Sequence, residues 1–319
     1  MNLLKTPAHC AAIILAVGLS TAATMAQAAD PASCKTVRFS DVGWTDITAT
    51  TAATSVVLKG LGYAPTATVL SVPVTYASLK NGDIDIFLGN WMPTMEADIK
   101  KYREEGSVET TGMNLAGAKY TLAVNKLAAD GGIAGFADIA KHRDKLNGKI
   151  YGIEPGNDGN RLIQDMIDKN AFGLQGFEVV ESSEQGMLAQ VARSNRKSEW
   201  IVFLGWEPHP MNANFKLTYL SGGDDYFGPN FGGAEVYTNT RKGYSAACPN
   251  VGKLLKNLKF TLAMENEIMG AILDDGVEPE KAAATWLKNN AAVAMTWVKG
   301  VMTLDGGDGA AAVKKHLGL

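Results

Sequence analysis

The sequence predicts an α/β protein of two lobes, each a mainly parallel sheet flanked by helices, with a cleft between the lobes. Three observations support this prediction. Strand-like and helix-like segments alternate with short connections, which is typical of parallel sheets covered on both faces. A hydrophobic strand reaches Phe-Leu-Gly and then Trp at residues 87–91, and the pattern returns at residues 203–206. Two widely separated cysteines suggest that the chain leaves its first lobe and later returns to it.

The first 28 residues form a separate segment, which we interpret as a secretory signal peptide. Lys5 gives a positive start, an apolar run follows at residues 11–19, and Ala-Gln-Ala at residues 26–28 has the form of a cleavage site. The alternative is a membrane anchor, but the apolar run is too short to span a bilayer. Cys10 lacks the small residues of a lipidation motif around it. We therefore expect an exported protein whose fold begins at residue 29.

The remaining chain is weakly acidic. Hydrophobic residues make up 46% of the sequence, which fits a globular protein with a packed core. Of the 30 lysines and arginines only Lys5 lies in the signal segment, and none of the 33 acids does, so the mature net charge is 29 minus 33, or −4. Because no long basic run occurs, we expect no nucleic-acid partner.

Cys34 and Cys248 are the two cysteines of the mature chain. An even pair in an exported protein predicts a disulfide, although two unrelated buried thiols are the alternative. On the chain-entropy model, a loop of this length stabilises by about 4–5 kcal/mol at most. If the bond forms, both cysteines belong to one lobe.

The first lobe should begin with a β-α-β-α-β unit. Its first strand ends in a loop that contains Trp44, and its third strand ends at Trp91. Gly60 and Gly62 end the first helix, and Asn81-Gly82 ends the second. The expected strands are 36–40, 67–72 and 85–91, and the expected helices are 47–60, 73–79 and 96–105.

The second lobe should repeat this alternation before the chain returns. Its expected strands are 120–124, 149–153, 178–180 and 200–204, and its expected helices are 138–145, 161–170 and 184–193. An apolar segment at 215–220 carries the chain back to a strand at 235–238 and helices at 251–262, 265–273 and 279–298. We expect residues 29–116 and 217–319 to form one lobe and residues 117–216 the other.

Aromatic residues gather at the predicted strand ends. Trp44, Trp91 and Trp206 each follow a strand and lie next to or near a glycine, and Tyr120 opens the second unit. Strand ends in open α/β sheets form the ligand crevice. Four electron-rich rings in one cleft would make a cage for a quaternary ammonium ion, which is held by ring quadrupoles and methyl packing. The alternative for any one tryptophan is core packing, which we expect for Trp200, Trp286 and Trp297.

Two polar residues bear on the choice of ligand. Asp46 lies two residues after Trp44 and is either a helix N-cap or a partner of the cation and of a ligand hydroxyl. Asn157 lies in a glycine-flanked loop and is either a turn residue or a second partner of that hydroxyl. A carboxylate at Asp46 would repel the carboxylate of a betaine and attract choline, which carries a hydroxyl and a net positive charge.

Three motifs carry a resemblance to a known family: Asp-Val-Gly-Trp-Thr-Asp at 41–46, Phe-Leu-Gly-Asn-Trp-Met-Pro at 87–93 and Phe-Leu-Gly-Trp-Glu-Pro-His-Pro at 203–210. Through essentially the whole mature chain, the sequence resembles the choline-binding proteins of bacterial ABC importers, in the betaine/choline branch of the periplasmic substrate-binding proteins. The resemblance implies the type II two-lobe fold with the ligand in the cleft between the lobes. It also implies a cage from Trp44, Trp91, Tyr120 and Trp206, with Asp46 and Asn157 at the choline hydroxyl.

The same resemblance implies a periplasmic protein that is a monomer and delivers choline to a membrane permease, with acetylcholine as a weaker ligand. A glycine betaine or proline betaine binding protein is the alternative within this class. The alternative from another class is a secreted choline-ester hydrolase that uses His209 and Glu207 as an acid/base pair. No nucleophile motif accompanies that pair, and no metal-ligand spacing appears, so we expect no catalytic residue, no metal and no cofactor.

Overall fold

The structure, a computed structural model, describes Met1 and residues 29–319, so all but the first residue of the predicted signal peptide lies outside the described residues. The strands are β1 (Thr36–Asp41), β2 (Ala64–Val69), β3 (Ile86–Met92), β4 (Val108–Asn125), β5 (Lys149–Tyr151), β6 (Glu178–Val180), β7 (Val202–Glu207), β8 (Leu217–Tyr219) and β9 (Gly233–Arg241).

Helices surround these strands. They are α1 (Thr45–Gly60), α2 (Val72–Asn81), α3 (Glu96–Glu104), α4 (Lys126–Asp130), α5 (Phe136–Ile139), α6 (Asp158–Asp168), α7 (Glu184–Lys197), α8 (Met211–Asn214), α9 (Asp224–Phe227), α10 (Pro229–Gly232), α11 (Tyr244–Ala247), α12 (Pro249–Asn257), α13 (Leu262–Leu273), α14 (Pro279–Asn289), α15 (Ala291–Trp297) and α16 (Gly309–Leu317). Among residues 29–319, no helix has both the length and the apolar character needed to cross a membrane.

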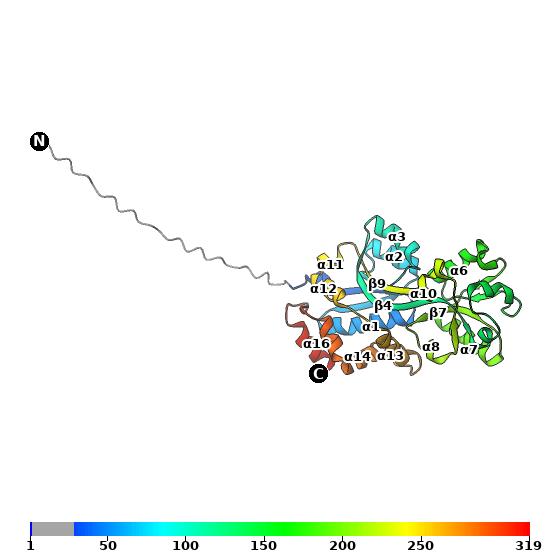
Figure 1. Ribbon diagram of the computed structural model, residues 1–319. Coiled ribbons are helices and arrows are strands. Elements are labelled where there is room, and N and C mark those ends of the chain that lie inside the picture. Colours follow the sequence, from blue (N-terminus) through cyan, green and yellow to red (C-terminus); the bar gives the residue numbers. More distant parts are fainter. Residues whose placement is uncertain (2–28) are drawn as a thin grey trace.

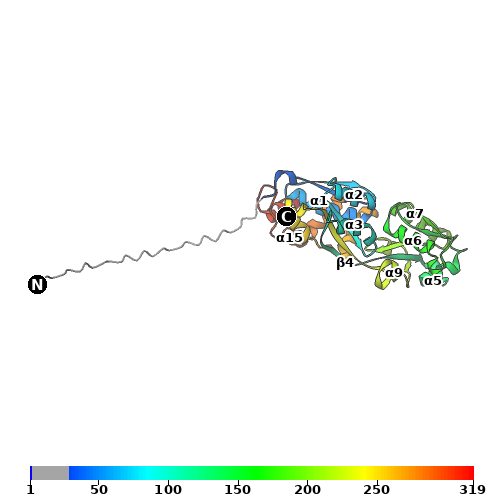
Figure 2. The ribbon, with the colours of Figure 1, turned by 90° about the horizontal axis from the view of Figure 1, so that it is seen from above.

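The elements form two groups, which Figures 1 and 2 show on either side of a crossing strand. We call β1–β3, β9, α1–α3 and α11–α16 the first lobe, and β5–β8 with α4–α9 the second lobe. In the first lobe, β2, β1 and β3 pair in parallel, and in the second, β6, β5 and β7 do so. Helices flank both sets, which confirms the predicted α/β fold with mainly parallel sheets.

The long strand β4 joins the lobes. Its first part pairs antiparallel with β9, and its last part pairs antiparallel with β7 and β8. The sheet therefore continues from one lobe to the other in the order β2-β1-β3-β9-β4-β7-β5-β6. From sequence we expected only residues 120–124 of this strand. The first half has no regular apolar alternation, because its register with β9 shifts at three places.

Several helix bounds differ from the prediction. The helix expected at 138–145 is shorter and begins earlier, because the Asp138 carboxylate accepts the N–H of Gly135 and so lies inside the first turn. The helix expected at 279–298 is broken at Asn290, whose backbone is not helical (φ −119°, ψ 45°). The C-terminal helix α16 was not predicted. These elements lie away from the cavity described below.

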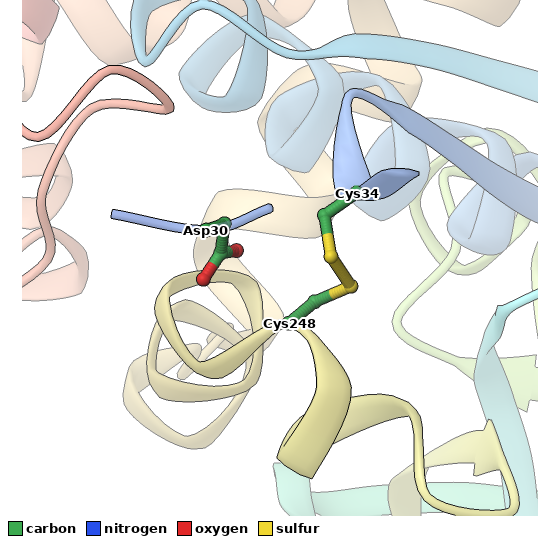
Figure 3. Close-up of side chains that lie close together, drawn as sticks. All are labelled: Asp30, Cys34 and Cys248. Atoms are coloured by element: carbon green, nitrogen blue, oxygen red, sulfur yellow. A yellow bond between two sulfur atoms is a disulfide. The ribbon is translucent and has the colours of Figure 1, made fainter. Parts of the chain in front are cut away.

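The predicted disulfide between Cys34 and Cys248 is present and closes a loop with a sequence separation of 214. It joins the segment before β1 to the turn that opens α12, so both cysteines lie in the first lobe. Asp30 lies beside it (Figure 3) and accepts bonds from the Tyr63 hydroxyl and the backbone N–H groups of Asn250 and Val251. Since the sulfurs bond each other and the carboxylate is occupied, this cluster offers no metal site.

Candidate functional site

A cavity with about 260 Å³ of empty space, which includes some open solvent, lies where the two lobes meet. All six residues predicted from sequence as ligand contacts line this cavity, together with two that were not predicted. The lining residues are Trp44, Asp46, Trp91, Tyr120, Ile153, Asn157, Asp158 and Trp206. They come from the N-terminus of α1, from β3, β4 and β7, and from the segment between β5 and α6. Both lobes therefore contribute walls.

The four aromatic rings are buried and close to one another. The ring centroids of Trp91 and Tyr120 are 6.0 Å apart, and those of Tyr120 and Trp206 are 6.4 Å apart. Tyr120 and Trp206 occupy paired positions in the antiparallel ladder of β4 and β7, which fixes their spacing. Phe227 packs edge-on behind Tyr120 at 5.9 Å and supports that wall. The strands thus hold Trp91, Tyr120 and Trp206 as parts of the sheet, whereas Trp44 is the N-cap residue of α1.

A glycine in β3 sets the position of Asp46. A side chain at Gly89 would lie 2.7 Å from the Ile47 side chain, so the glycine lets the first turn of α1 pack directly on the strand. Asp46 lies in that turn, and its Oδ2 accepts a bond from the Trp91 Nε1 at 3.2 Å. The alternative that Asp46 caps the helix is wrong, because Trp44 holds the N-cap position and Asp46 follows inside the helix.

The second carboxylate oxygen of Asp46 has no donor. Asp46 is 1% exposed, and no protein group in the described part of the chain bonds to its Oδ1. Burial raises the pKa of Asp46 to about 8, with a further contribution from the charge of Glu184. The Trp91 N–H and the helix backbone oppose this rise only in part. A cation in the cavity would supply the missing partner.

Asn157 has a structural role and also lines the cavity. Its Oδ1 accepts the N–H of Asn160 at 3.1 Å, so it is the N-cap of α6 rather than only a turn residue. The same oxygen accepts the Tyr120 hydroxyl at 2.9 Å, which orients the ring. The Asn157 Nδ2 points to Asp158 at a longer distance of 3.3 Å. The side chain therefore keeps some capacity to bond a ligand hydroxyl.

Sequence reasoning missed Asp158 and Ile153. Asp158 is fully buried, and its Oδ2 has no hydrogen-bond partner in the described residues. Burial raises the pKa of Asp158 to about 6, against the effect of a bond from Thr94. Its position directly after Asn157 was the signal available in the sequence. Ile153 lies two residues after β5 and ends the strand expected at 149–153, and only that strand-end position could have indicated it.

Three contacts close the lobes over the cavity. The Trp44 Nε1 of the first lobe donates to Glu154 of the second at 2.8 Å. Arg161 and Asp98 form an ion pair between α6 and α3 at 2.6 Å. The backbone N–H of Thr45 in α1 donates to Glu184 in α7 at 2.8 Å. The cavity is thus held in a closed form.

His209 does not form the acid/base pair considered from the sequence. Its Nε2 faces Glu184 at 3.2 Å, whereas Glu207 pairs with Lys119. The His209 Nδ1 accepts a hydrogen bond from the backbone N–H of Met211, so the Nε2 carries the ring N–H and donates a hydrogen bond to Glu184. His209 does not line the cavity, and its ring is anchored on both nitrogens.

A glycine at the start of α6 leaves room for Tyr120. A Cβ at Gly159 would lie 2.1 Å from the Tyr120 hydroxyl oxygen. We expect Gly159→Ala to displace this ring and to weaken binding of the ligand proposed below about ten-fold, the scale of one cation–π wall. Calorimetric titration checks this. Gly112→Ala is the matched control, because a Cβ there meets nothing within 4 Å. Unchanged affinity in Gly159→Ala would show that the Tyr120 position is not needed.

The arrangement suits one kind of ligand. Aromatic faces and two incompletely bonded carboxylates surround the cavity, and no lysine, arginine or histidine lines it within the described residues. Aromatic rings and carboxylates favour a cation, and rings favour one whose methyl groups cannot donate hydrogen bonds. A ligand carboxylate would find no cationic partner among these lining residues.

Comparison with known proteins gives a consistent result. Residues 35–289 match the family model described as the substrate-binding domain of an ABC-type glycine betaine transport system. A solved ABC-transporter choline-binding protein in complex with choline has 70% identity and a TM-score of 0.90, over 90% of this chain and 100% of that chain. An ABC-transporter choline-binding protein in an unliganded semi-closed conformation has 71% identity and a TM-score of 0.83, with the same coverage. The glycine betaine/carnitine transport binding protein of Listeria monocytogenes is 29% identical over 163 residues, which are 51% of this chain and 53% of that protein.

Proposed function

The chain belongs to the family of substrate-binding domains of ABC-type glycine betaine transport systems, and on that premise we propose that it binds choline in the cavity between its lobes. The trimethylammonium group lies among Trp44, Trp91, Tyr120 and Trp206. Asp46 and Asn157 face the choline hydroxyl. The closed protein then delivers choline to the membrane permease of an ABC importer. Likeness at 70% identity to a protein solved with choline supports the proposal.

One observation carries the choice of choline over a betaine. The Asp46 carboxylate lies in the cavity with one oxygen unbonded, and no basic side chain among the described residues lines the cavity. A betaine carboxylate would face a like charge there, whereas choline has none. Choline also adds a hydroxyl that a carboxylate can accept.

Calorimetric titration with choline and glycine betaine side by side tests this choice. We expect choline to bind with an affinity of micromolar order, about −8 kcal/mol, and glycine betaine to bind much more weakly. Acetylcholine, which lacks the hydroxyl donor, should lie between them. A clear preference for glycine betaine or proline betaine would overturn the choline assignment and leave the family assignment intact.

The family is one of transport proteins, and we propose that this member performs no chemistry on its ligand. Both ring nitrogens of His209 are engaged in bonds to Glu184 and Met211, which leaves it without a proton-transfer role toward the cavity. Incubation of the protein with acetylcholine should release no acetate. Release of acetate at a rate that scales with protein concentration would support the hydrolase alternative.

We further propose how the chain is organised and where it acts. Residues 29–116 and the chain from β9 onward move as one lobe, and residues 117–216 with β8 and α9 move as the other, with the hinge where β4 crosses. The boundary expected at residue 217 then falls after α9, because β8 pairs with the end of β4. The first 28 residues direct export and are removed, so the mature protein meets its permease in the periplasm as a monomer. The contacts of Trp44 with Glu154 and of Arg161 with Asp98 then form only when the lobes close.

A further inference from the structure

Glu184 forms one of the contacts between the lobes. It is the first residue of α7, is 1% exposed, and does not line the cavity itself. Its carboxylate accepts the Thr45 backbone N–H at 2.8 Å, the Thr45 hydroxyl at 2.6 Å and the His209 Nε2 at 3.2 Å. Thr45 directly precedes Asp46 in α1. Closing the lobes therefore brings a second buried carboxylate next to the one that faces the ligand.

Asp46 and Glu184 have no lysine or arginine partner among the described residues. Asp46 meets Glu184 from α7, Glu265 from α13, which packs on α1, and Asp158 at the start of α6. Within the described residues, no lysine or arginine forms an ion pair with Asp46, Glu184 or Glu265. Among the described residues, His209 is the one basic side chain that contacts Glu184, and its Nδ1 accepts the Met211 N–H. The closed, empty cavity thus places like charges together in a buried setting.

We propose that Glu184 makes closure of the lobes conditional on a positive charge at Asp46, which is the choline cation in the complex and a proton in the empty protein. The part of this inference in which choline supplies the positive charge rests on the proposed function. Glu184 acts here as a positioning residue, since it does not touch the ligand. Its bonds to Thr45 favour closure, and its charge opposes closure unless Asp46 is neutral or paired.

The direction of the pH effect follows from linkage. In the closed form, burial and then the Glu184 charge raise the pKa of Asp46 to about 8. In an open form, Asp46 meets water and loses Glu184, so its pKa returns toward its ordinary range near 4. The form with the higher pKa binds the proton, so closure of the empty protein becomes more favourable as the pH falls through 8. Between pH 9 and pH 7 the closing equilibrium should rise roughly ten-fold.

Other acids act in the same direction but more weakly in this range: Glu154 beside the cavity, Asp158 in its wall, and Asp41 of β1, whose pKa is raised by burial and by the Glu184 charge. Burial raises the pKa of Glu154 to about 7 and that of Asp158 to about 6. Between pH 9 and pH 7, Glu154 should raise the closing equilibrium by a further factor of about two, and Asp158 should leave it almost unchanged. With choline bound, the cation replaces the proton at Asp46, so the closed fraction should not depend on pH in this range through Asp46.

Single-molecule energy transfer between dyes on the two lobes tests this inference. Lys100→Cys on α3 and Lys169→Cys after α6 provide attachment sites, since their side chains are 57% and 65% exposed. The ligand-free protein is measured at pH 9 and pH 7, and saturating choline supplies the closed reference. We expect the ratio of closed to open molecules to rise about twenty-fold between pH 9 and pH 7 in the otherwise unchanged protein, about ten-fold through Asp46 and two-fold through Glu154.

Three variants separate this role from a merely structural one. Asp46→Asn should lose the ten-fold contribution of Asp46 and keep only that of the remaining acids, and Glu184→Gln should show a smaller rise than the parent while it still offers an acceptor to Thr45. If Glu184 had only a structural role, Glu184→Gln would lower the closed fraction equally at both pH values. The rise in the ratio of closed to open molecules between pH 9 and pH 7 would then equal that of the parent. Glu265→Gln is the matched control: it changes a buried acid near Asp46 that makes no contact between the lobes, and it should respond as the parent does.

Two results would overturn the inference: no pH response in the parent, or a rise as large as the parent's in Asp46→Asn or Glu184→Gln. A failure of choline to produce a closed reference would instead count against the proposed function. Circular dichroism of each variant at both pH values establishes that the fold is retained. Closure with choline but without the pH response contradicts only the role of Glu184.

Discussion

Replacing Asp46 with asparagine should weaken choline binding by roughly 150-fold, or about 3 kcal/mol, the lower end for breaking a buried charge pair. The side chain is 1% exposed, and one of its oxygens has no partner in the described protein. Asparagine keeps the shape and the bond from Trp91 but cannot offset the charge of the buried cation. Calorimetric titration of both proteins at pH 8.5, above the pKa of Asp46, gives the difference in binding free energy.

A second ligand separates the effect of the Asp46 charge from that of its contact with the choline hydroxyl. Tetramethylammonium has the same charged group as choline but no hydroxyl, so Asp46→Asn should weaken it less than it weakens choline. Equal losses for the two ligands would remove the hydroxyl contact and leave the charge role. Glu265→Gln is the control for changing a buried acid nearby, and its choline affinity should change little. Unchanged choline affinity in Asp46→Asn would contradict both roles.

Replacing Trp206 with alanine should weaken choline binding by at least about 30-fold. A desolvated aromatic face contributes up to about 2 kcal/mol to a cation, and alanine would also open the cavity to water. Trp206 is 4% exposed and stands on the second lobe opposite Trp91. The loss should appear in the dissociation constant measured by titration, while the thermal unfolding temperature without ligand reports any loss of packing.

Trp286→Ala provides the matched control for Trp206→Ala. Trp286 lies on α14, donates its Nε1 to Glu267, and does not line the cavity. Its replacement removes the same indole from the molecule and should leave choline affinity within about two-fold. If both variants bind choline as tightly as the parent does, the rings are core residues and the cage does not exist.

The sequence was sufficient to predict the parts of the site that follow from strand ends. Trp44, Trp91 and Trp206 each follow or end a hydrophobic strand, and parallel strands bring such ends to one edge. Tyr120 was placed in the cage because it opens the second unit and because of the family resemblance, since its strand pairing with Trp206 cannot be inferred from residues 119–121 alone. The α/β alternation, the parallel strands and the disulfide followed from periodicity and cysteine number.

The contacts that join the lobes could not be predicted. Glu184 and Glu154 contact Thr45 and Trp44, respectively, and these pairs are more than a hundred residues apart in sequence. Neither acid lies in a distinctive motif, and Glu184 looks like an ordinary acid in the first turn of a helix. Their importance arises from the closed arrangement of two lobes. His209 was paired with its sequence neighbour Glu207 because its contact with Glu184 joins two segments of the second lobe that are 25 residues apart, and sequence spacing does not show such a contact.

A crystal structure of the protein grown with choline tests the central claim most directly. The account predicts that the choline nitrogen lies within about 6 Å of the ring centroids of Trp44, Trp91, Tyr120 and Trp206. It also predicts that the hydroxyl lies within hydrogen-bonding distance of Asp46 or Asn157. Choline located outside this cavity, or an empty cavity at saturating choline, would contradict the account.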